Sequence, residues 1–115
     1  MLKEKQKITH VLGELVSYAL ACEPQKVTIT IEDLTDAIQV TVEDAGAQMD
    51  ENACRQATRF LNSSGRDELK DYYSGLAGEE HLGPGDLRIV GMMVDGGSVE
   101  QTECGTRITV WWKRE

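Results

Sequence analysis

The chain has 115 residues, a net charge of −8 and a pI near 4.7, which suits one domain, residues 1–115, around a single core. This acidic balance argues against nucleic acid or an anionic membrane surface as a partner, and no apolar run approaches the roughly 20 residues of a membrane helix. The odd number of widely spaced cysteines favours neither a disulfide framework nor a zinc site, as expected of a cytoplasmic protein; they are Cys22, Cys54 and Cys104.

An amphipathic helix is predicted over residues 4–22, ahead of Pro24, because apolar residues recur there at helical spacing; they are Ile8, Leu12, Leu15, Val16 and Ala19. Two strands should follow, since "KVTITIE" and "AIQVTVED" both alternate apolar and polar residues. The turn-like "DLTD" between them predicts an antiparallel hairpin with one buried face.

The periodic pattern weakens between Asp44 and about Gly85. Two stretches there, "CRQATRFL" and "DELKDYYSGL", are compatible with short helices, and the glycine-containing remainder predicts loops with few core contacts. A second buried helix is expected in "DLRIVGMMVD", and "GSVEQTE" and "TRITVWWKRE" predict two more strands. The sum is a two-layer α+β sandwich, a mostly antiparallel sheet covered by helices on one face.

Four short motifs occur in one order along the chain: "ELVSYA", "VEDAGAQMD", "LGPGDLRIV" and "CGTRITVWW". In this order they resemble the GHKL ATPase superfamily, also called the histidine-kinase-like or Bergerat ATPase fold, and most closely its small anti-sigma-factor serine kinases. The resemblance covers nearly the full length of the chain. It implies ATP or ADP as the ligand and an ATP lid over residues 47–85.

The first motif, "ELVSYA", resembles the family's N-box, where a glutamate acts as general base and an asparagine four residues later ligates magnesium. Glu14 stands at the position of the base, and Tyr18 replaces the asparagine. A phenol with an ordinary pKa of about 10 is a poor ligand for Mg²⁺, which requires compact oxygen donors in octahedral geometry. The resemblance therefore implies a base without its metal ligand. The alternative is that Glu14 is a solvated helix carboxylate.

The second motif, "EDAGAQMD", resembles the G1 box, where an aspartate accepts a hydrogen bond from the adenine amino group and glycines let the backbone approach the base. Asp44 and Gly46 match these positions. The box's second glycine is absent, since Ala47 is followed by Gln48, so a methyl group is expected to press on the nucleotide. The alternative is that Asp44 only caps a turn after a strand.

The third motif, "HLGPGDLRIV", stands in place of the G2 box, whose backbone amides and helix N-terminus hold phosphates. Gly83 and Gly85 supply flexible backbone there. Pro84 removes one donor amide, and Asp86 puts a negative charge where phosphate would lie. Weakened phosphate binding is therefore expected, with Asp86 serving as a plain helix N-cap.

The last motif, "ECGTRITVWW", resembles the closing strand of the family, where a Gly-Thr pair precedes the strand and the threonine hydroxyl helps to bind adenine. Gly105 and Thr106 match this pair. Trp111 and Trp112 are consecutive strand residues, so they are predicted on opposite faces, one in the core and the other available to a partner.

Three classes of function remain open. The first is an active ATP-dependent serine kinase or ATPase with Glu14 as general base. The second, favoured by Tyr18 and Asp86, is a regulatory domain that retains adenine-nucleotide binding, lacks Mg²⁺ and controls a protein partner. The resemblance implies a sigma factor, an anti-anti-sigma protein or a response regulator as that partner, and a homodimer is compatible with it. The third is a structural subunit without a ligand, because fold alone does not determine function.

Overall fold

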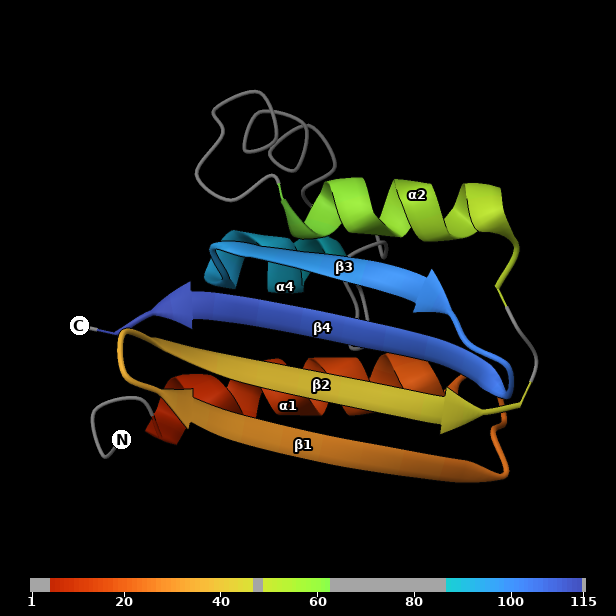
Figure 1. Ribbon diagram of the computed structural model, residues 1–115, viewed down its shortest axis with the longest axis horizontal. Helices are drawn as coiled ribbons and strands as arrows, with labels where there is room; N and C mark the ends of the chain where they lie inside the picture. The colour runs from red at the N-terminus through yellow and green to blue at the C-terminus, as the bar shows by residue number, and fades with distance from the viewer. Residues whose placement is uncertain (1–4, 47–48, 63–86, 115) are drawn as a thin grey trace, which may run out of the picture.

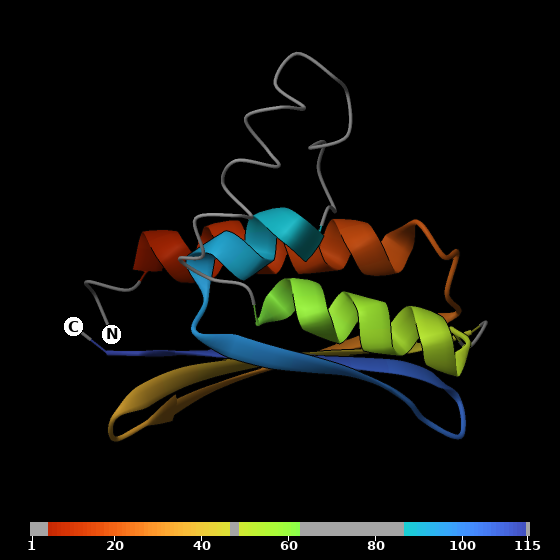
Figure 2. The same ribbon diagram turned by 90° about the horizontal axis from the view of Figure 1, so that it is seen from above.

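The computed structural model describes residues 5–46, 49–62 and 87–114. Its strands form one sheet in the order β1-β2-β4-β3, in which every neighbouring pair is antiparallel. Figure 1 shows the sheet in front of the helices, and the turned view in Figure 2 shows the helices gathered on one face. The predicted two-layer α+β architecture is confirmed. The elements in chain order are α1 (Lys5–Leu20), β1 (Lys26–Leu34), β2 (Ala37–Ala45), α2 (Glu51–Leu61), α4 (Leu87–Met93), β3 (Gly96–Gln101) and β4 (Gly105–Lys113).

The central part of the core lies between α1 and the two central strands. Its apolar side chains come from one stripe of α1 and from the helix-facing positions of β2 and β4, as the alternating patterns predict. The two tryptophans lie on opposite faces as expected, since Trp112 is buried and Trp111 is 39% exposed. The contributing residues are Ile8, Val11, Leu15, Ala19, Ile38, Val40, Val42, Ile108, Val110 and Trp112.

The first strand departs from the prediction of a hairpin with one buried face. β1 alternates apolar and polar residues as β2 does, but Ile29 is 43% exposed and Ile31 is 41% exposed. The reason is the strand order, which puts β1 at an edge of the sheet, whereas β2 has neighbours on both sides. The fully buried residues of the hairpin therefore lie on β2, and β1 contributes only the partly buried Val27.

Helix α2 is a second correction, because it falls inside the segment predicted as a lid with few core contacts. It buries Cys54, Ala57 and Leu61 and packs along β3. Its N-cap is Asp50, whose side chain accepts a 2.7 Å hydrogen bond from the backbone N–H of Ala53. Helix α2 is therefore packed on the core, and the parts of the predicted lid at residues 47–48 and 63–85 lie outside the described residues.

Helix α4 is the buried helix predicted in "DLRIVGMMVD", and Gly91 is the reason it can pack where it does. Gly91 lies against the end of α2, where an added Cβ would overlap the carbonyl group of Phe60. Its missing side chain lets α4 approach α2 closely while Leu87 and Val90 enter the core. The proposed N-cap, Asp86, lies outside the described residues. Within the described ranges, no helix has the length and apolar character to cross a membrane.

Candidate functional site

Two predicted site residues, far apart in sequence, meet at one end of the sheet. Asp44 near the end of β2 is the direct cross-strand neighbour of Thr106 at the start of β4. Both side chains are buried, with 8% of Asp44 and 2% of Thr106 exposed. Gly105 makes room for the carboxylate, because a Cβ there would lie 2.8 Å from Asp44 Oδ1. The Gly-Thr pair therefore has a packing role next to Asp44.

Asp44 carries an unsatisfied hydrogen-bond acceptor. Its buried Oδ1 atom has no hydrogen-bond partner among the described residues. Burial raises the pKa of this carboxyl above its ordinary value, and a backbone hydrogen bond from Thr106 offsets part of that rise. Most buried polar atoms in folded proteins are paired, so an unpaired carboxylate oxygen needs an explanation, and a ligand donor is one.

Tyr18 and Met49 complete the cluster. The Tyr18 hydroxyl donates to the Met49 sulfur over 3.4 Å, and the Met49 N–H donates to the Thr106 hydroxyl over 3.4 Å. Burial, followed by the nearby Cys22, Cys54 and Asp44, raises the pKa of Tyr18 to about 12. Tyr18 is therefore a neutral phenol at any physiological pH. Its hydroxyl already has a partner within the protein.

A cavity of about 420 Å³ adjoins Tyr18 and Met49, whereas Asp44 and Thr106 are not among its lining residues. Tyr18 and Met49 belong to its wall, together with Phe60 of α2 and Leu87 and Arg88 of α4. Its volume lies in the range of small-ligand pockets, about 300–1,000 Å³. Its wall combines aromatic and aliphatic surface, suited to a flat ring, with the positive charge of Arg88. We refer to this space as the α1–α2–α4 cavity. Asp44 instead lines a separate hollow of about 410 Å³ together with Lys26 and Arg107.

Glu14 lies one helical turn before Tyr18, on the same side of α1. Its side chain is only 14% exposed, and Oε2 lies 3.7 Å from Nε2 of His10. It is therefore less solvated than the surface carboxylate that the alternative reading predicted. It does not belong to the described lining of the α1–α2–α4 cavity.

The remaining predicted residues divide into two groups. Gly46 follows the sheet end that carries Asp44, and its N–H donates to the Cys104 carbonyl over 2.9 Å, joining β2 to the β3–β4 turn. Gly83 and Gly85 lie outside the described residues. Sequence reasoning missed Met49 and Arg88. Met49 stood inside the quoted "EDAGAQMD", and Arg88 inside "LGPGDLRIV", but neither matches a family position that the motifs supply.

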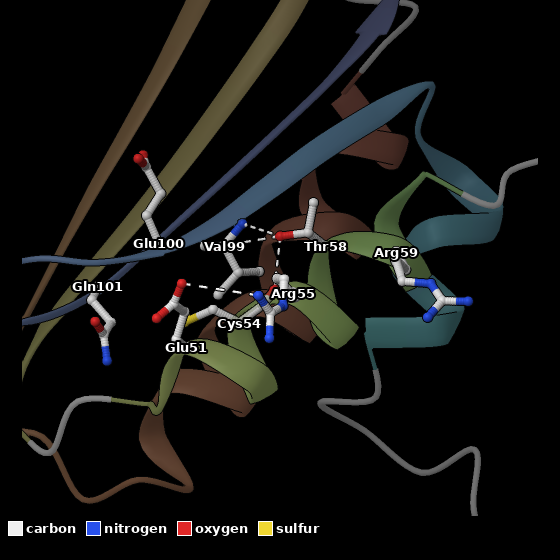
Figure 3. Close-up of a pocket in the computed structure, with 8 residues that line it drawn as sticks. All are labelled: Glu51, Cys54, Arg55, Thr58, Arg59, Val99, Glu100 and Gln101. Carbon is white, nitrogen blue, oxygen red and sulfur yellow. Dashed lines mark hydrogen bonds and ion pairs between the residues drawn. The ribbon is translucent and has the colours of Figure 1, made fainter.

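A separate hollow of about 410 Å³ lies between α2 and β3. Figure 3 shows Arg55 and Arg59 of α2 and Glu100 of β3 around it, with Cys54 and Thr58 between the helix and the strand. Burial raises the pKa of the Cys54 thiol, so this cysteine is not an activated nucleophile. None of the predicted site residues lines this hollow.

The fold and the Asp44 cluster define a class of protein: a two-layer sandwich with a buried carboxylate at the end of a central strand, beside a cavity lined by helices. A comparison with protein-family models matches residues 3–115 to the histidine kinase-, DNA gyrase B- and HSP90-like ATPases. The chain belongs to this GHKL-like ATPase family, whose members bind ATP or ADP. A comparison with curated proteins gave no match.

Proposed function

We propose that this chain is a regulatory ATPase-like domain that binds the adenine ring of a nucleotide and does not transfer its phosphate. The observation that carries this proposal is the unpaired Oδ1 atom of Asp44. A buried carboxylate oxygen suits the exocyclic amino group of adenine, which is a hydrogen-bond donor. The Thr106 hydroxyl lies beside it on the neighbouring strand.

The residues present fit an adenine ring. Gly105 lets Asp44 pack closely against β4, and Tyr18 and the flexible thioether residue Met49 line the adjoining α1–α2–α4 cavity. A thioether packs well against an aromatic ring. Asp44 would orient the ring through its amino group, and burial would exclude competing water from that hydrogen bond.

The residue at the family's magnesium-ligand position, Tyr18, does not fit a magnesium ion. Tyr18 occupies the place of the family's asparagine, remains neutral because its pKa is about 12, and donates a hydrogen bond to the Met49 sulfur. Phosphoryl transfer depends on a metal-held phosphate and an oriented nucleophile. We therefore propose that Glu14 has the position of a general base but not the role.

Calorimetric titration with adenosine, ADP and ATP tests the proposal, with each ligand measured with and without Mg²⁺. Adenosine and ADP should bind with similar affinity, and Mg²⁺ should change neither value, because the adenine ring supplies the recognition. Asp44→Asn should weaken all three ligands by roughly tenfold or more, since it replaces a charged acceptor. ATP binding far more tightly than adenosine would contradict the proposal.

Two control variants separate the parts of this site. Glu43→Gln changes the adjacent carboxylate, which is 42% exposed and pairs with Arg107, and it should leave binding unchanged. Arg88→Ala removes the positive charge from the cavity wall. If it weakened ADP but not adenosine, the phosphates would bind at α4 and the adenine-only proposal would be wrong.

The second part of the proposal is control of a protein partner, of the sigma factor, anti-anti-sigma protein or response regulator type. Its support is the likeness to anti-sigma-factor kinases together with Trp111, a 39% exposed aromatic on β4. Exposed tryptophans often anchor partners. A neighbouring gene for one of these three protein types would identify the partner to test. Trp111→Ser should then weaken the complex at least tenfold, whereas Glu14→Ala should leave it intact.

The competing function is an active serine kinase or ATPase that uses Glu14. The low exposure of its side chain is the observation in favour of this function. Magnesium-dependent ATP hydrolysis that disappears specifically in Glu14→Ala would establish it. Under our proposal, the purified protein shows no such hydrolysis above background.

A further inference from the structure

The two edge strands of the sheet, β1 and β3, differ in whether other residues form hydrogen bonds with their outward backbone groups. At the β3 edge, side chains of α2 and of its C-cap residue form hydrogen bonds with the outward backbone groups of the strand. Asn62 accepts from the N–H of Gly97 over 3.2 Å and donates to its carbonyl over 2.7 Å. Thr58 accepts from the N–H of Val99 over 2.9 Å, a bond drawn in Figure 3. Helix α2 therefore closes this edge, as expected of a protected sheet.

The opposite edge, β1, is open. Leu34 and Ala37 flank a two-residue turn, so they form a hydrogen-bonded pair, and even-numbered residues of β1 direct their backbone groups toward β2. The N–H and C=O groups of Val27, Ile29 and Ile31 therefore point outward. Among the described residues, no segment forms hydrogen bonds with these outward groups. A nine-residue strand thus offers an unpaired ladder.

The open edge is also apolar on the helix-facing side. Ile29 and Ile31 are 43% and 41% exposed there, and Val27 is half-buried. On α1, Leu12 and Leu20 lie on the flank opposite Tyr18 and so away from the cavity that Tyr18 lines, and Figure 1 shows α1 behind β2 and β1. Leu20 is 56% exposed. Exposed apolar side chains beside an unpaired strand mark an interaction surface.

We propose that a second copy of this chain covers the edge, by antiparallel pairing of β1 with β1 about a two-fold axis at Ile29. This register puts Ile29 opposite Ile29 and Val27 opposite Ile31, which joins the apolar strips of the two copies. On the other face it puts Lys26 opposite Glu32, twice by symmetry. A single strand is thus self-complementary in both shape and charge.

The neighbouring register is less favourable. If Ile29 lay opposite Ile31, Val27 would oppose the carboxylate of Asp33, and Thr28 would oppose Glu32. The lysine at position 26 would then face Leu34. Of these two registers, the one centred on Ile29 pairs apolar side chains with apolar ones and opposite charges with each other. It would give one continuous antiparallel sheet through both copies.

Analytical ultracentrifugation of the full chain tests this proposal. The expected species has twice the monomer mass of 12.7 kDa. Ile29→Lys should give a monomer, because two lysines would meet at the axis, while circular dichroism should stay unchanged because the side chain is exposed. Met92→Lys is the matched control, since Met92 is 45% exposed on α4, and it should remain a dimer. A wild-type monomer at about 100 µM, well above the micromolar range of specific dimers, would overturn the proposal, whichever other partner uses the edge.

Two further variants test the register. Lys26→Glu should weaken the dimer roughly tenfold by placing like charges opposite each other twice, and adding Glu32→Lys should restore it. In a Cys22→Ser/Cys104→Ser background, Ile29→Cys should crosslink the two copies on oxidation and Ile31→Cys should not. Crosslinking through residue 31 alone, or no rescue by the charge swap, would exclude this interface.

Discussion

Burial of the Asp44 carboxylate destabilises the folded protein, but it also provides a hydrogen-bond acceptor for a ligand. The pKa of this carboxyl is raised above its ordinary value of 3.8, mainly because the group is buried. The folded protein therefore holds the proton more tightly than the unfolded chain does. It follows that ionised Asp44 lowers the free energy of unfolding as the pH rises above about 4.

Asp44→Asn should accordingly stabilise the ligand-free protein at pH 7, by roughly 1 kcal/mol, because it removes a buried charge. The gain should shrink as the pH falls toward 3.8, where the wild-type carboxyl is protonated as well. Urea unfolding at pH 7 and pH 4 measures both values, with Glu43→Gln as the exposed control. An equal loss of stability at both pH values would instead support the plain turn-capping role.

Tyr18 permits a gain-of-function test of the magnesium argument. Tyr18→Asn restores the compact amide oxygen of the family's N-box, one turn after Glu14, and should make ATP affinity depend on Mg²⁺. Tyr18→Phe removes only the hydroxyl that donates to Met49 and should bring no such dependence. Calorimetry with and without Mg²⁺ distinguishes the two. A magnesium effect already present in wild type would refute the assignment of Tyr18 as the missing ligand.

At the scale of elements, two helical glycines should respond to alanine in opposite directions. Gly91 packs against the Phe60 carbonyl, so Gly91→Ala forces α4 away from α2 and should cost about 3 kcal/mol. Gly13 on α1 is exposed, with nothing within 4 Å of an added Cβ, so Gly13→Ala should stabilise by about 0.5–1 kcal/mol. Thermal and urea unfolding compare them. Equal effects would mean that the α2–α4 contact is not tight.

The hydrogen bonds between α2 and β3, which close this edge of the sheet, can be tested by a substitution in α2. Thr58→Val keeps the shape of the side chain but leaves the Val99 N–H without its acceptor. The variant should lose about 1 kcal/mol of stability. The amide of Val99 should then exchange its hydrogen faster, while exchange at Val40 in the sheet centre follows only the global change. Unchanged exchange at Val99 would show that α2 does not protect this edge.

At the scale of the whole molecule, ligand binding should raise the free energy of unfolding and the Tm. A ligand that binds only the folded state at 100 times its Kd adds about 2.7 kcal/mol, or very roughly 10 °C in Tm for a chain of this size. Adenosine and ADP should each produce this shift in the wild type, and at the same concentrations the tenfold weaker binding of Asp44→Asn should reduce it to about half or less. An ADP shift of undiminished size in Asp44→Asn would place the nucleotide elsewhere.

The sequence by itself determined most of the elements and the order of the four motifs along the chain. Period-two alternation predicted β2 and β4, helical spacing predicted α1, and the order of motifs singled out Asp44 and Thr106. These signals are strong because each element buries one continuous apolar stripe, which is visible locally. Helix α2 was harder to recognise as core, because its buried stripe of Cys54, Ala57 and Leu61 is small and weakly apolar.

Only the tertiary structure decided which of the apolar strand faces are buried under helices. β1 and β2 have the same alternation, yet Val40 is fully buried and Ile31 is 41% exposed. Alternation reports which residues share a face, but not the strand order or the position of the helices. The order β1-β2-β4-β3 leaves β1 at an edge, and the same order brings Asp44 beside Thr106. Both the site and the open edge therefore depend on long-range pairing, which no local pattern encodes.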